Sequence, residues 1–540
     1  MRKLLLIMML TALVVPFANS QTLTNTNLPI FVITTPQGVS IGDDPRIVAH
    51  LGVIYNGTNA NHNINDPYNN YDGNIAIEIR GSTSQQYPKK GYGFETQDAL
   101  GNNAQIGLCG LPPENDWILY GPYPDKTLIR NVLTYHLFEE MGHYSPRTHY
   151  IELIIDGDYR GVYVLTERIK IDDFRLTLQD VSSPNVFNDT LTGAYVLKVD
   201  KLTGEVGYTW ESLYDNEVVF QFHDPEFDEL NSMQASYMED YIGQFEQAIQ
   251  GPGMDLPPGQ GGWRDFIDYE SFNDFFIMQE LGRTVDGYRS SSFLYKDKNY
   301  SWNAKIKAGP MWDFNLSFGN ADYCDAQLTT GWQYNFDQVC NFSTSIPFWW
   351  DRLLDSPGYR NALRCRWDEL RQGILSTSYI NNFIDSVALD LEDARIRNFQ
   401  RWPIIGQYVN WNGFVGQTYQ EDVDYMKTWI QQRSEWIDLN LGGTCNLSTN
   451  EIEQAPQYHR AWPNPINDQF TIGFSLFNAG SIAIRVVDLT GREITYTDLG
   501  TKFDGTHAHT FSSLDWNSGS YLYSVLVDGE ELYTGKLIKK

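Results

Sequence analysis

The spacing of apolar residues divides most of the chain into a strand-rich first part and a helix-rich second part. Over residues 28–201, short apolar runs alternate with polar positions, as at 75–80 (Ile-Ala-Ile-Glu-Ile-Arg), which is typical of half-buried strands. Two further apolar runs, 151–155 and 162–165, flank the turn-forming segment 156–161 and predict a β-hairpin.

Helical spacing of apolar residues becomes dominant after the Pro- and Gly-rich loop 252–262. An earlier helix is expected from a cap at Asp125 to Met141. The later helices are expected at residues 265–281, 346–374, 376–399 and 418–440. Two short strands, 292–296 and 305–308, interrupt them. This order predicts an α+β fold with a cleft where the two parts meet.

The end of the chain returns to short alternating strands. Residues 446–460 are polar and lack an apolar period, so we expect a linker there. Turn residues such as Asp528-Gly529 separate the apolar runs that follow. Strands are expected at 470–474, 482–488, 521–527 and 532–538. They predict a small β-sandwich over residues 461–540.

The beginning of the chain has the pattern of a secretory signal peptide. Two basic residues precede an apolar run at 4–17, and small residues follow at 18–20. The run is short for a membrane span, although an uncleaved anchor stays open. We expect a signal peptide at 1–20, a first domain at 22–445, and no transmembrane segment in the mature chain.

Composition narrows the class of protein. The chain of 540 residues carries 68 acidic and 39 basic residues, a net charge of −29, which argues against nucleic acid as a partner. Aromatic residues make up 14%, which favours well-filled cores. Export permits disulfides, and Cys324–Cys340 would close a short loop, but the pairing of the five cysteines stays open and one thiol is left over.

Several catalytic classes lack their motifs. The chain has no G-x-x-x-x-G-K-[ST] loop, no H-E-x-x-H and no G-x-S-x-G, and its nine histidines show no ligand spacing. Charged residues in apolar or aromatic surroundings stand out instead, and they match the lysine and carboxylates that phosphoryl transfer requires. They also suit structural roles: a turn cap for Asp313, a pair with an exposed arginine for Glu167, and a solvated edge for Lys89-Lys90.

Five motifs follow one another in a characteristic order. They are Ile-Arg-Gly-Ser-Thr-Ser (79–84) through Pro-Lys-Lys-Gly-Tyr (88–92), Asn-Asp-Trp-Ile-Leu (115–119), Asp-Lys-Thr (125–127) with Arg130-Asn131, Asp-Tyr-Arg-Gly-Val-Tyr (158–163) leading to Glu167, and Trp-Asp-Phe-Asn (312–315) with Phe318-Gly319. Over roughly 28–440 the chain resembles the spore-coat CotH kinase family. The resemblance implies an atypical kinase-like fold and a protein kinase that uses ATP with Mg²⁺ or Mn²⁺ to phosphorylate Ser, Thr or Tyr hydroxyls of a protein substrate.

The resemblance also implies a role for each matching residue. The implied nucleotide-binding residues are Arg80, Lys89, Lys90 and Glu167, with Lys90 preferred at the phosphates and Glu167 as the ion-pair partner of the lysine. The implied metal and catalytic residues are Asp286, Asp313 and Asn315, with Asp313 as the main metal ligand and Asp286 as the catalytic or second metal-site carboxylate. Asn315 stands where many members carry a second Asp, so weaker metal binding is expected. An inactive kinase-like envelope protein is the alternative, and a carboxylate-based polysaccharide hydrolase ranks last.

The last domain resembles a second family. Its matching segments are Pro-Asn-Pro (463–465), Val-Val-Asp-Leu-Thr-Gly-Arg (486–492), Gly-Ser-Tyr-Leu-Tyr (519–523) and Lys-Leu-Ile-Lys-Lys (536–540), and they resemble a type IX secretion sorting domain. This implies a Bacteroidetes-type cell, the type IX machinery as a partner, and a secreted or surface location. An ordinary immunoglobulin-like binding module is the alternative.

Overall fold

The computed structural model describes most of the chain and divides it into two compact units, residues 1–445 and 446–540. The described residues are 23–178, 191–202, 207–299, 304–445, 459–462, 464–466, 468–476, 480–488, 491–502 and 505–539. The predicted signal peptide (1–20) and most of the predicted linker (446–460) lie outside them.

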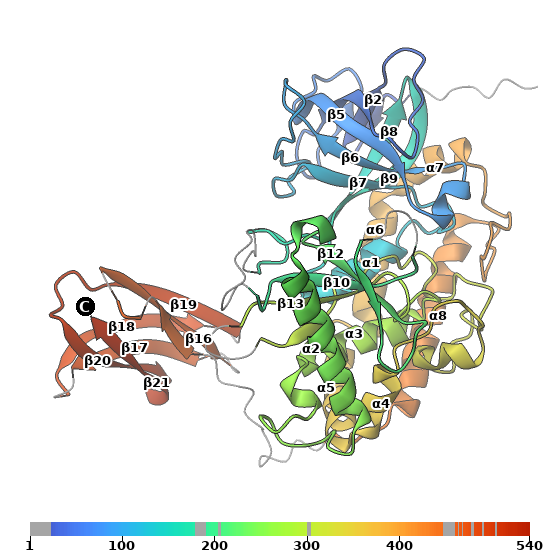
Figure 1. Ribbon diagram of the computed structural model, residues 1–540. Coiled ribbons are helices and arrows are strands. Elements are labelled where there is room, and N and C mark those ends of the chain that lie inside the picture. Colours follow the sequence, from blue (N-terminus) through green and yellow to red (C-terminus); the bar gives the residue numbers. More distant parts are fainter. Residues whose placement is uncertain are drawn as a thin grey trace, which may run out of the picture. The chain divides into compact units, whose positions relative to one another are not determined.

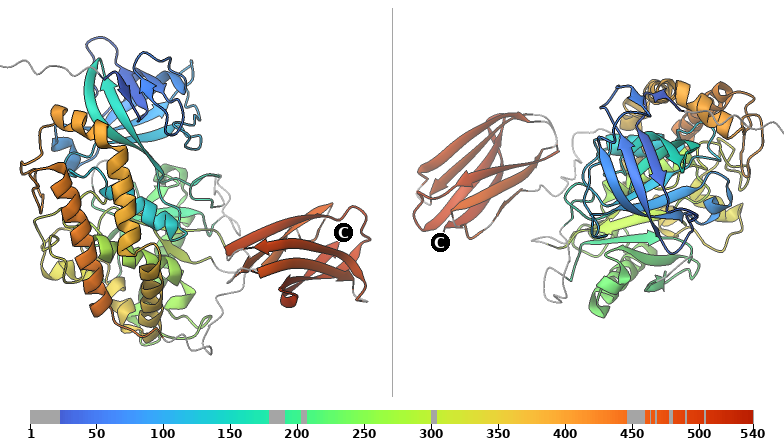
Figure 2. Two further views of the ribbon diagram at one scale, coloured as in Figure 1. Left: turned by 180° about the vertical axis from the view of Figure 1, so that it is seen from behind. Right: turned by 90° about the horizontal axis from the view of Figure 1, so that it is seen from above.

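The first unit begins with a closed barrel, in which the described strands follow the order β2-β3-β5-β6-β7-β9-β8 (Figure 1; Figure 2, right). They are β2 (Ile30–Thr34), β3 (Ile47–Ile54), β5 (Tyr71–Arg80), β6 (Gly91–Thr96), β7 (Asp116–Tyr120), β8 (Thr148–Ile155) and β9 (Asp158–Glu167). Parallel pairing of β2 with β8 closes the barrel and removes both sheet edges. Alternating apolar residues such as Leu51, Ile77 and Trp117 fill its interior. Short strands β1 (Asn25–Thr26) and β4 (His62–Asn63) pair beside it.

The predicted hairpin at 151–165 is confirmed as β8 and β9. Its turn is shorter than the six residues that the sequence suggested. Ile155 pairs with Asp158, so only Asp156 and Gly157 connect the strands. Both have positive φ, 51° and 76°, which is the geometry that suits the right-handed twist of a two-residue hairpin.

A second sheet lies in the later part of the first unit, in the order β11-β12-β10-β13-β14. Its strands are β10 (Tyr195–Val199), β11 (Thr209–Glu211), β12 (Val219–Asp224), β13 (Ser292–Lys296) and β14 (Ile306–Ala308). The predicted strand 292–296 is confirmed, and the strand expected from residue 305 begins at Ile306.

Helices make up most of the rest of the first unit. They are α1 (Arg130–Glu140), α2 (Ser232–Gln250), α3 (Tyr269–Gly282), α4 (Trp349–Asp355), α5 (Pro357–Gln372), α6 (Thr377–Asp390), α7 (Glu392–Arg401) and α8 (Tyr419–Asn440). Helices α6–α8 (orange) run along one side of this unit (Figure 2, left). One large cluster of buried aromatic and aliphatic side chains joins the helices to the second sheet.

Three helix predictions need correction. The helix expected at 346–374 is split because Ser356 caps a new helix whose first residue is Pro357, and the helix expected at 376–399 is interrupted at Leu391. Helix α1 begins at Arg130 rather than after Asp125, since the Asp125 carboxylate accepts the Arg130 backbone N–H across a left-handed Leu128. Helix α2, with a capping box at Asn231, was not predicted.

Two disulfides are found among the described residues, Cys324–Cys340 and Cys365–Cys445. The second joins α5 to the end of the first unit. Cys109 is the thiol left over, and it is buried in the barrel core.

The second unit is a β-sandwich. Strands β15, β16 and β19 form one sheet, and β18, β17, β20 and β21 form the other. Their bounds are β15 (His459–Trp462), β16 (Gln469–Leu476), β17 (Gly480–Asp488), β18 (Glu493–Lys502), β19 (Gly505–Ser512), β20 (Gly519–Val527) and β21 (Glu530–Lys539). The four predicted strands are present. Strand β18 escaped prediction because it is largely exposed and lacks apolar alternation.

Among the described helices, none has the length and apolarity to cross a membrane.

Candidate active site

A cavity of about 700 Å³ lies between the barrel and the second sheet of the first unit. The barrel contributes the end of β5, the segment that leads into β6, and part of β7. The opposite lining comes from segments at one end of the second sheet. Cavity residues that carry charge are Arg80, Lys89, Asp200, Lys201, Asp286 and Asp313. The cleft expected where the two parts meet is therefore present.

Antiparallel pairing gathers three carboxylates at that end of the sheet. The end of β10 lies beside the start of β13, because Val199 pairs with Ser292. The end of β14 lies at the same edge, because β13 and β14 are also antiparallel. Asp200 follows β10, Asp286 precedes β13, and Asp313 follows β14, so residues more than 100 positions apart meet in one cavity.

Asp313 is the most perturbed of the three carboxyl groups. Burial raises its pKa to about 7, and the nearby Asp286 and Asp200 carboxylates act in the same direction. The Asn315 side-chain amide donates a hydrogen bond to Asp313 and opposes this shift. The Asp313 backbone is left-handed, with φ of 60°, and the Asp313 N–H donates to the Tyr135 hydroxyl oxygen at 3.3 Å.

Asp286 lies on the segment between α3 and β13. Burial raises the pKa of its carboxyl group, and Asp200 adds to the rise. Arg289 and Lys201 act against the rise because their positive charges favour the ionised form. Asp286 is thus an acid whose charge is stabilised by two cations.

Asp200 and Lys201 belong to the site, and sequence reasoning did not identify them. Burial raises the pKa of Asp200, although its carboxylate accepts the Lys201 backbone N–H at 2.9 Å. Lys201 is exposed, lines the cavity, and lowers the pKa of both Asp286 and Asp313. The available signal was a charged pair placed directly after the apolar run Tyr195–Val199.

The carboxylates fit a divalent cation that arrives with its own oxygen ligands. Among the described residues, no group of three or more His, Cys, Asp and Glu side chains is arranged to hold a metal ion. Burial, together with the charges of Asp286 and Asp200, raises the pKa of Asp313, and a cation at these carboxylates would favour its ionised form. Mg²⁺ commonly binds through one or two carboxylates plus phosphate oxygens and water, and Asp313 and Asn315 fit that mode.

The two candidate lysines differ in position. Lys89 lines the cavity but is only 2% exposed, and its ammonium donates to the Val162 carbonyl at 2.5 Å and to Asn398 Oδ1 at 2.8 Å. Burial lowers its pKa well below the usual value. Lys90, the preferred candidate, donates instead to the Gln85 carbonyl at 2.5 Å and is not among the cavity residues.

Glu167 has a different partner from the one expected. Its carboxylate is 0% exposed and contacts Arg175 at 3.1 Å and Arg147 at 2.9 Å. The Lys90–Glu167 ion pair implied by the resemblance is therefore replaced by an arginine pair, because the Lys90 ammonium turns to Gln85. The alternative expectation for Glu167 is confirmed as to an arginine partner but wrong as to exposure, because Arg175 is buried and Arg147 is only partly exposed.

Arg80 reaches the cavity from the end of β5. Its guanidinium lies 5.8 Å from the centre of the Trp312 ring, next to Asp313 in the chain. Burial lowers its pKa to about 10, and the nearby Arg168 adds to this. Arg80, Lys89 and Lys201 are thus the basic residues of the cavity among the residues that the structure describes.

Comparison with known families agrees with this architecture. A family model described as CotH kinase protein matches residues 77–437, well over half of the chain. The chain belongs to the CotH kinase protein family. A model described as a secretion system C-terminal sorting domain matches residues 460–540. This type IX sorting domain makes the CotH-family chain a secreted or cell-surface protein and implies the secretion machinery as a partner.

Other comparisons add little. No curated protein matches the chain. Among solved structures, a Pseudomonas fluorescens alkylpurine DNA glycosylase, AlkC, bound to DNA containing an abasic site analog, aligns at 13% identity with a TM-score of 0.12. The alignment covers 37% of this chain and 56% of that chain, so the CotH-family chain spans about half of the glycosylase. A likeness this low carries no argument about fold or function.

Proposed function

We propose that this CotH-family protein is a protein kinase that transfers the γ-phosphate of ATP to a hydroxyl group of a protein substrate, with Mg²⁺ or Mn²⁺ as cofactor. The observation that carries the proposal is the convergence of Asp200, Asp286 and Asp313 with Lys201 in one cavity. Phosphoryl transfer depends on positioning and on charge stabilisation, which this set of residues supplies.

Asp286 and Asp313 take separate roles in the proposed reaction. The acceptor hydroxyl oxygen attacks the γ-phosphorus, and the bond from that phosphorus to the β–γ bridging oxygen breaks. The electron pair leaves with ADP, and the hydroxyl proton passes to Asp286, whose ionised form Arg289 and Lys201 favour against the effect of burial. Asp313 and Asn315 hold the metal ion, which when bound neutralises phosphate charge.

Lys201 is the proposed phosphate contact in place of Lys90. It is exposed at the cavity, and its ammonium forms no ion pair with another described residue. Arg80 adds a second positive charge on the barrel side. Lys89 is held by Val162 and Asn398, so its role in the proposal is to fix the cavity wall.

Thermal unfolding of the mature full-length chain tests nucleotide binding. With ATP and Mg²⁺ or Mn²⁺ at 100 times Kd, ligand binding stabilises the folded state by about 2.7 kcal/mol, so the Tm rises. Neither ATP with a chelator nor the Asp313→Asn variant is expected to show the rise. Transfer of labelled phosphate from γ-labelled ATP to a Ser-, Thr- and Tyr-containing protein then tests catalysis. Absence of any metal-dependent rise would refute the kinase proposal.

The second candidate function is an inactive kinase-like protein of the cell envelope. Asn315 favours it, because an amide in place of a carboxylate removes one negative charge from the metal site. The sorting domain also directs the chain to the cell exterior, where ATP is scarce. A Tm rise with ATP but no phosphate transfer to any protein would select this candidate.

A further inference from the structure

Aromatic side chains form one wall of the cavity beside the carboxylates. Tyr323, Phe342 and Trp411 all line the cavity. The ring centres of Tyr323 and Phe342 are 6.1 Å apart, and those of Tyr323 and Trp411 are 6.2 Å apart. Asp286 and Asp313 both act on the pKa of the Tyr323 phenol, which burial raises, so this aromatic wall adjoins the proposed base.

The disulfide Cys324–Cys340 holds two of these rings in place. Cys324 follows Tyr323 directly, and Cys340 lies two residues before Phe342. A hydrogen bond of 3.0 Å from the Asp322 N–H to the Trp411 carbonyl joins the third ring to the same segment. All three rings are therefore tied to the loop that the disulfide closes.

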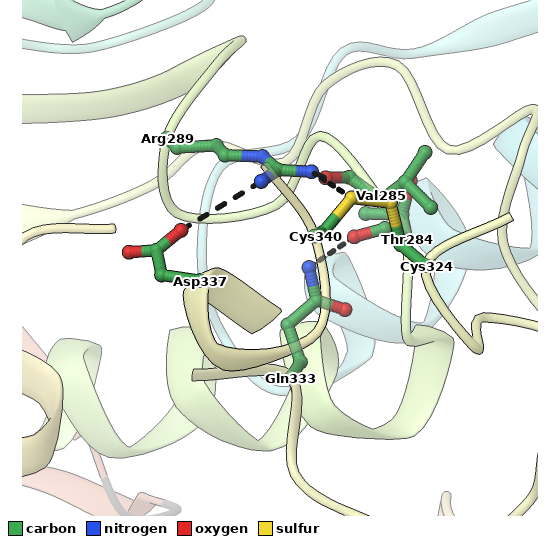
Figure 3. Close-up of a disulfide and its surroundings, with 7 residues drawn as sticks. All are labelled: Thr284, Val285, Arg289, Cys324, Gln333, Asp337 and Cys340. Carbon is green, nitrogen blue, oxygen red and sulfur yellow. Dashed lines mark hydrogen bonds and ion pairs between the residues drawn. A yellow bond between two sulfur atoms is a disulfide. The ribbon is translucent and has the colours of Figure 1, made fainter. Parts of the chain in front are cut away.

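The same loop is fastened to the segment that carries Asp286 (Figure 3). The Arg289 guanidinium lies 3.9 Å from the centre of the Phe342 ring and donates to the Val285 carbonyl at 2.5 Å. The Gln333 side-chain amide donates to the Thr284 carbonyl. These contacts fix the position of the aromatic wall relative to Asp286. The wall is therefore placed to contact the substrate group that binds at the proposed base.

The charges around the aromatic wall narrow the chemical class of the substrate group that it can bind. Residues 323–342 contain Asp325 and Asp337 and no Lys or Arg. The cavity itself contains three carboxylates, and of its three basic residues Arg80 and Lys89 come from the barrel side and Lys201 is assigned to the phosphates. Arg289, next to Phe342, is buried and pairs with Asp337. An acidic acceptor would meet repulsion from both sets of carboxylates, whereas a flat apolar group would stack on the rings, of which Phe342 is 39% exposed.

We propose that Tyr323, Phe342 and Trp411 recognise the phosphoacceptor as a peptide segment with an aromatic side chain beside its acceptor hydroxyl and no acidic residue nearby. The Cys324–Cys340 disulfide keeps the rings in register with Asp286. This inference rests on the proposed kinase function. The acceptor, rather than the nucleotide, meets this wall because the base must contact the hydroxyl that it deprotonates.

Three matched serine peptides test the recognition, with Tyr, Ala or Glu beside the serine. The full mature chain is expected to phosphorylate the Tyr peptide with a kcat/KM at least 10-fold above the Ala peptide, and the Glu peptide least. In Phe342→Ala this preference falls below about 3-fold through a higher peptide KM, while the Tm rise with ATP and metal is unchanged. Phe342→Tyr keeps the preference.

Binding of labelled peptides that carry Ala at the acceptor position separates the two proposals, because it does not need catalysis. Transfer without preference among the peptides would overturn the recognition and leave the kinase standing. Aromatic-dependent binding that Phe342→Ala weakens, with no transfer to any peptide, would refute the kinase and keep the wall as a peptide site. Binding of an oligosaccharide but of no peptide would overturn the inference.

The disulfide is tested with two paired variants. Cys324→Ser with Cys340→Ser is expected to raise the KM for the Tyr peptide about as much as Phe342→Ala does. Cys365→Ser with Cys445→Ser is the control, because neither of those cysteines lies within two residues of a cavity residue in the chain, as Cys324 and Cys340 do. An equal KM in both paired variants would overturn the positioning role of Cys324–Cys340. Should the first pair fail to fold, Phe342→Ala still decides the recognition.

Discussion

Two carboxylates of the first unit differ in their neighbours. Glu167 on the barrel is fully buried, whereas Asp313 after the second sheet is half-buried and lines the cavity. Glu167 contacts two arginines, so its charge is neutralised within the fold. Asp313 has two further carboxylates nearby, and its pKa rises to about 7. A carboxylate with cation partners stabilises the fold, whereas one beside other carboxylates is available to a cation from outside.

The same contrast applies to the lysines. Lys89 is enclosed and makes two hydrogen bonds within the protein, whereas Lys201 is exposed at the cavity. Polar groups whose hydrogen bonds are satisfied within the protein contribute to structure, whereas polar groups exposed at a cavity are free to bind a ligand. The comparison favours the end of the second sheet, rather than the barrel, as the location of the proposed chemistry.

The largest expected effect follows the substitution Asp313→Asn. Phosphate transfer should fall by about 100-fold or more, because the proposed main metal ligand loses its negative charge. Asparagine tolerates the left-handed backbone of this position, φ 60°, so the fold should persist. Initial-rate kinetics measures the rate of phosphate transfer, and circular dichroism measures whether the fold persists. The matched control is Asp325→Asn, at φ 56° and outside the cavity, which should leave the rate unchanged.

Glu167→Gln should affect stability and not nucleotide binding. Removing the carboxylate charge leaves Arg147 without its counter-charge and leaves the buried Arg175 with only Asp172 and Glu114, at a cost of about 3 kcal/mol in the free energy of unfolding. Urea denaturation measures this, with the exposed Glu140→Gln on α1 as control. An unchanged free energy of unfolding together with loss of ATP binding would contradict the structural role of Glu167. It would support the role implied by the resemblance, as ion-pair partner of the phosphate-binding lysine.

Lys201→Met should weaken ATP binding about 10-fold, since one phosphate contact and its charge are removed. Lys90→Met is the matched control, because the Lys90 ammonium contacts the Gln85 carbonyl away from the cavity lining. Isothermal titration with ATP and Mg²⁺ measures both dissociation constants. A larger loss in Lys90→Met would show that the lysine implied by the resemblance binds the phosphates.

The smallest expected effect is on the pH dependence of stability without metal. Since burial and the neighbouring carboxylates raise the pKa of folded Asp313 to about 7, the folded state binds an extra proton between its unfolded value of 3.8 and that pH. The stabilisation is present below pH 3.8 and is lost as the pH rises through 7. Denaturation at pH 5 and pH 8 with a chelator should show this decline in the free energy of unfolding. The Asp313→Asn variant should lack the part of the decline that comes from Asp313. A parallel decline in both proteins would contradict the assigned pKa.

The periodicity of apolar residues predicted much of the secondary structure, because helix and strand patterns depend on residues that are close together in the sequence. The β8–β9 hairpin followed from two apolar runs around turn residues, and α8 from helical spacing, both of which are local properties. Local spacing was less reliable at interruptions such as Leu391, where one turn ends a helix without a strong breaker. Strand β18 lacked an apolar face and gave no signal.

The site could be predicted only in part from the sequence. Motif order pointed to Asp286 and Asp313, and the cavity contains both. The same reasoning paired Lys90 with Glu167, but the arginines that hold Glu167 lie 20 residues before it and 8 residues after it, in segments that meet only in the folded barrel. Asp200 and Lys201 belong to no motif and enter the site through the register of β10 on β13.

What the sequence by itself determined is the succession of strand-rich part, helix-rich part and sorting domain, because alternation, helical spacing and family motifs are carried within short segments. What only the tertiary structure decided is which charges meet: Lys89 with Asn398, Glu167 with its arginines, and three carboxylates around one cavity. The reason is physical. Strand register and barrel closure set these long-range distances, and a charge becomes structural or functional according to the partner that they bring to it.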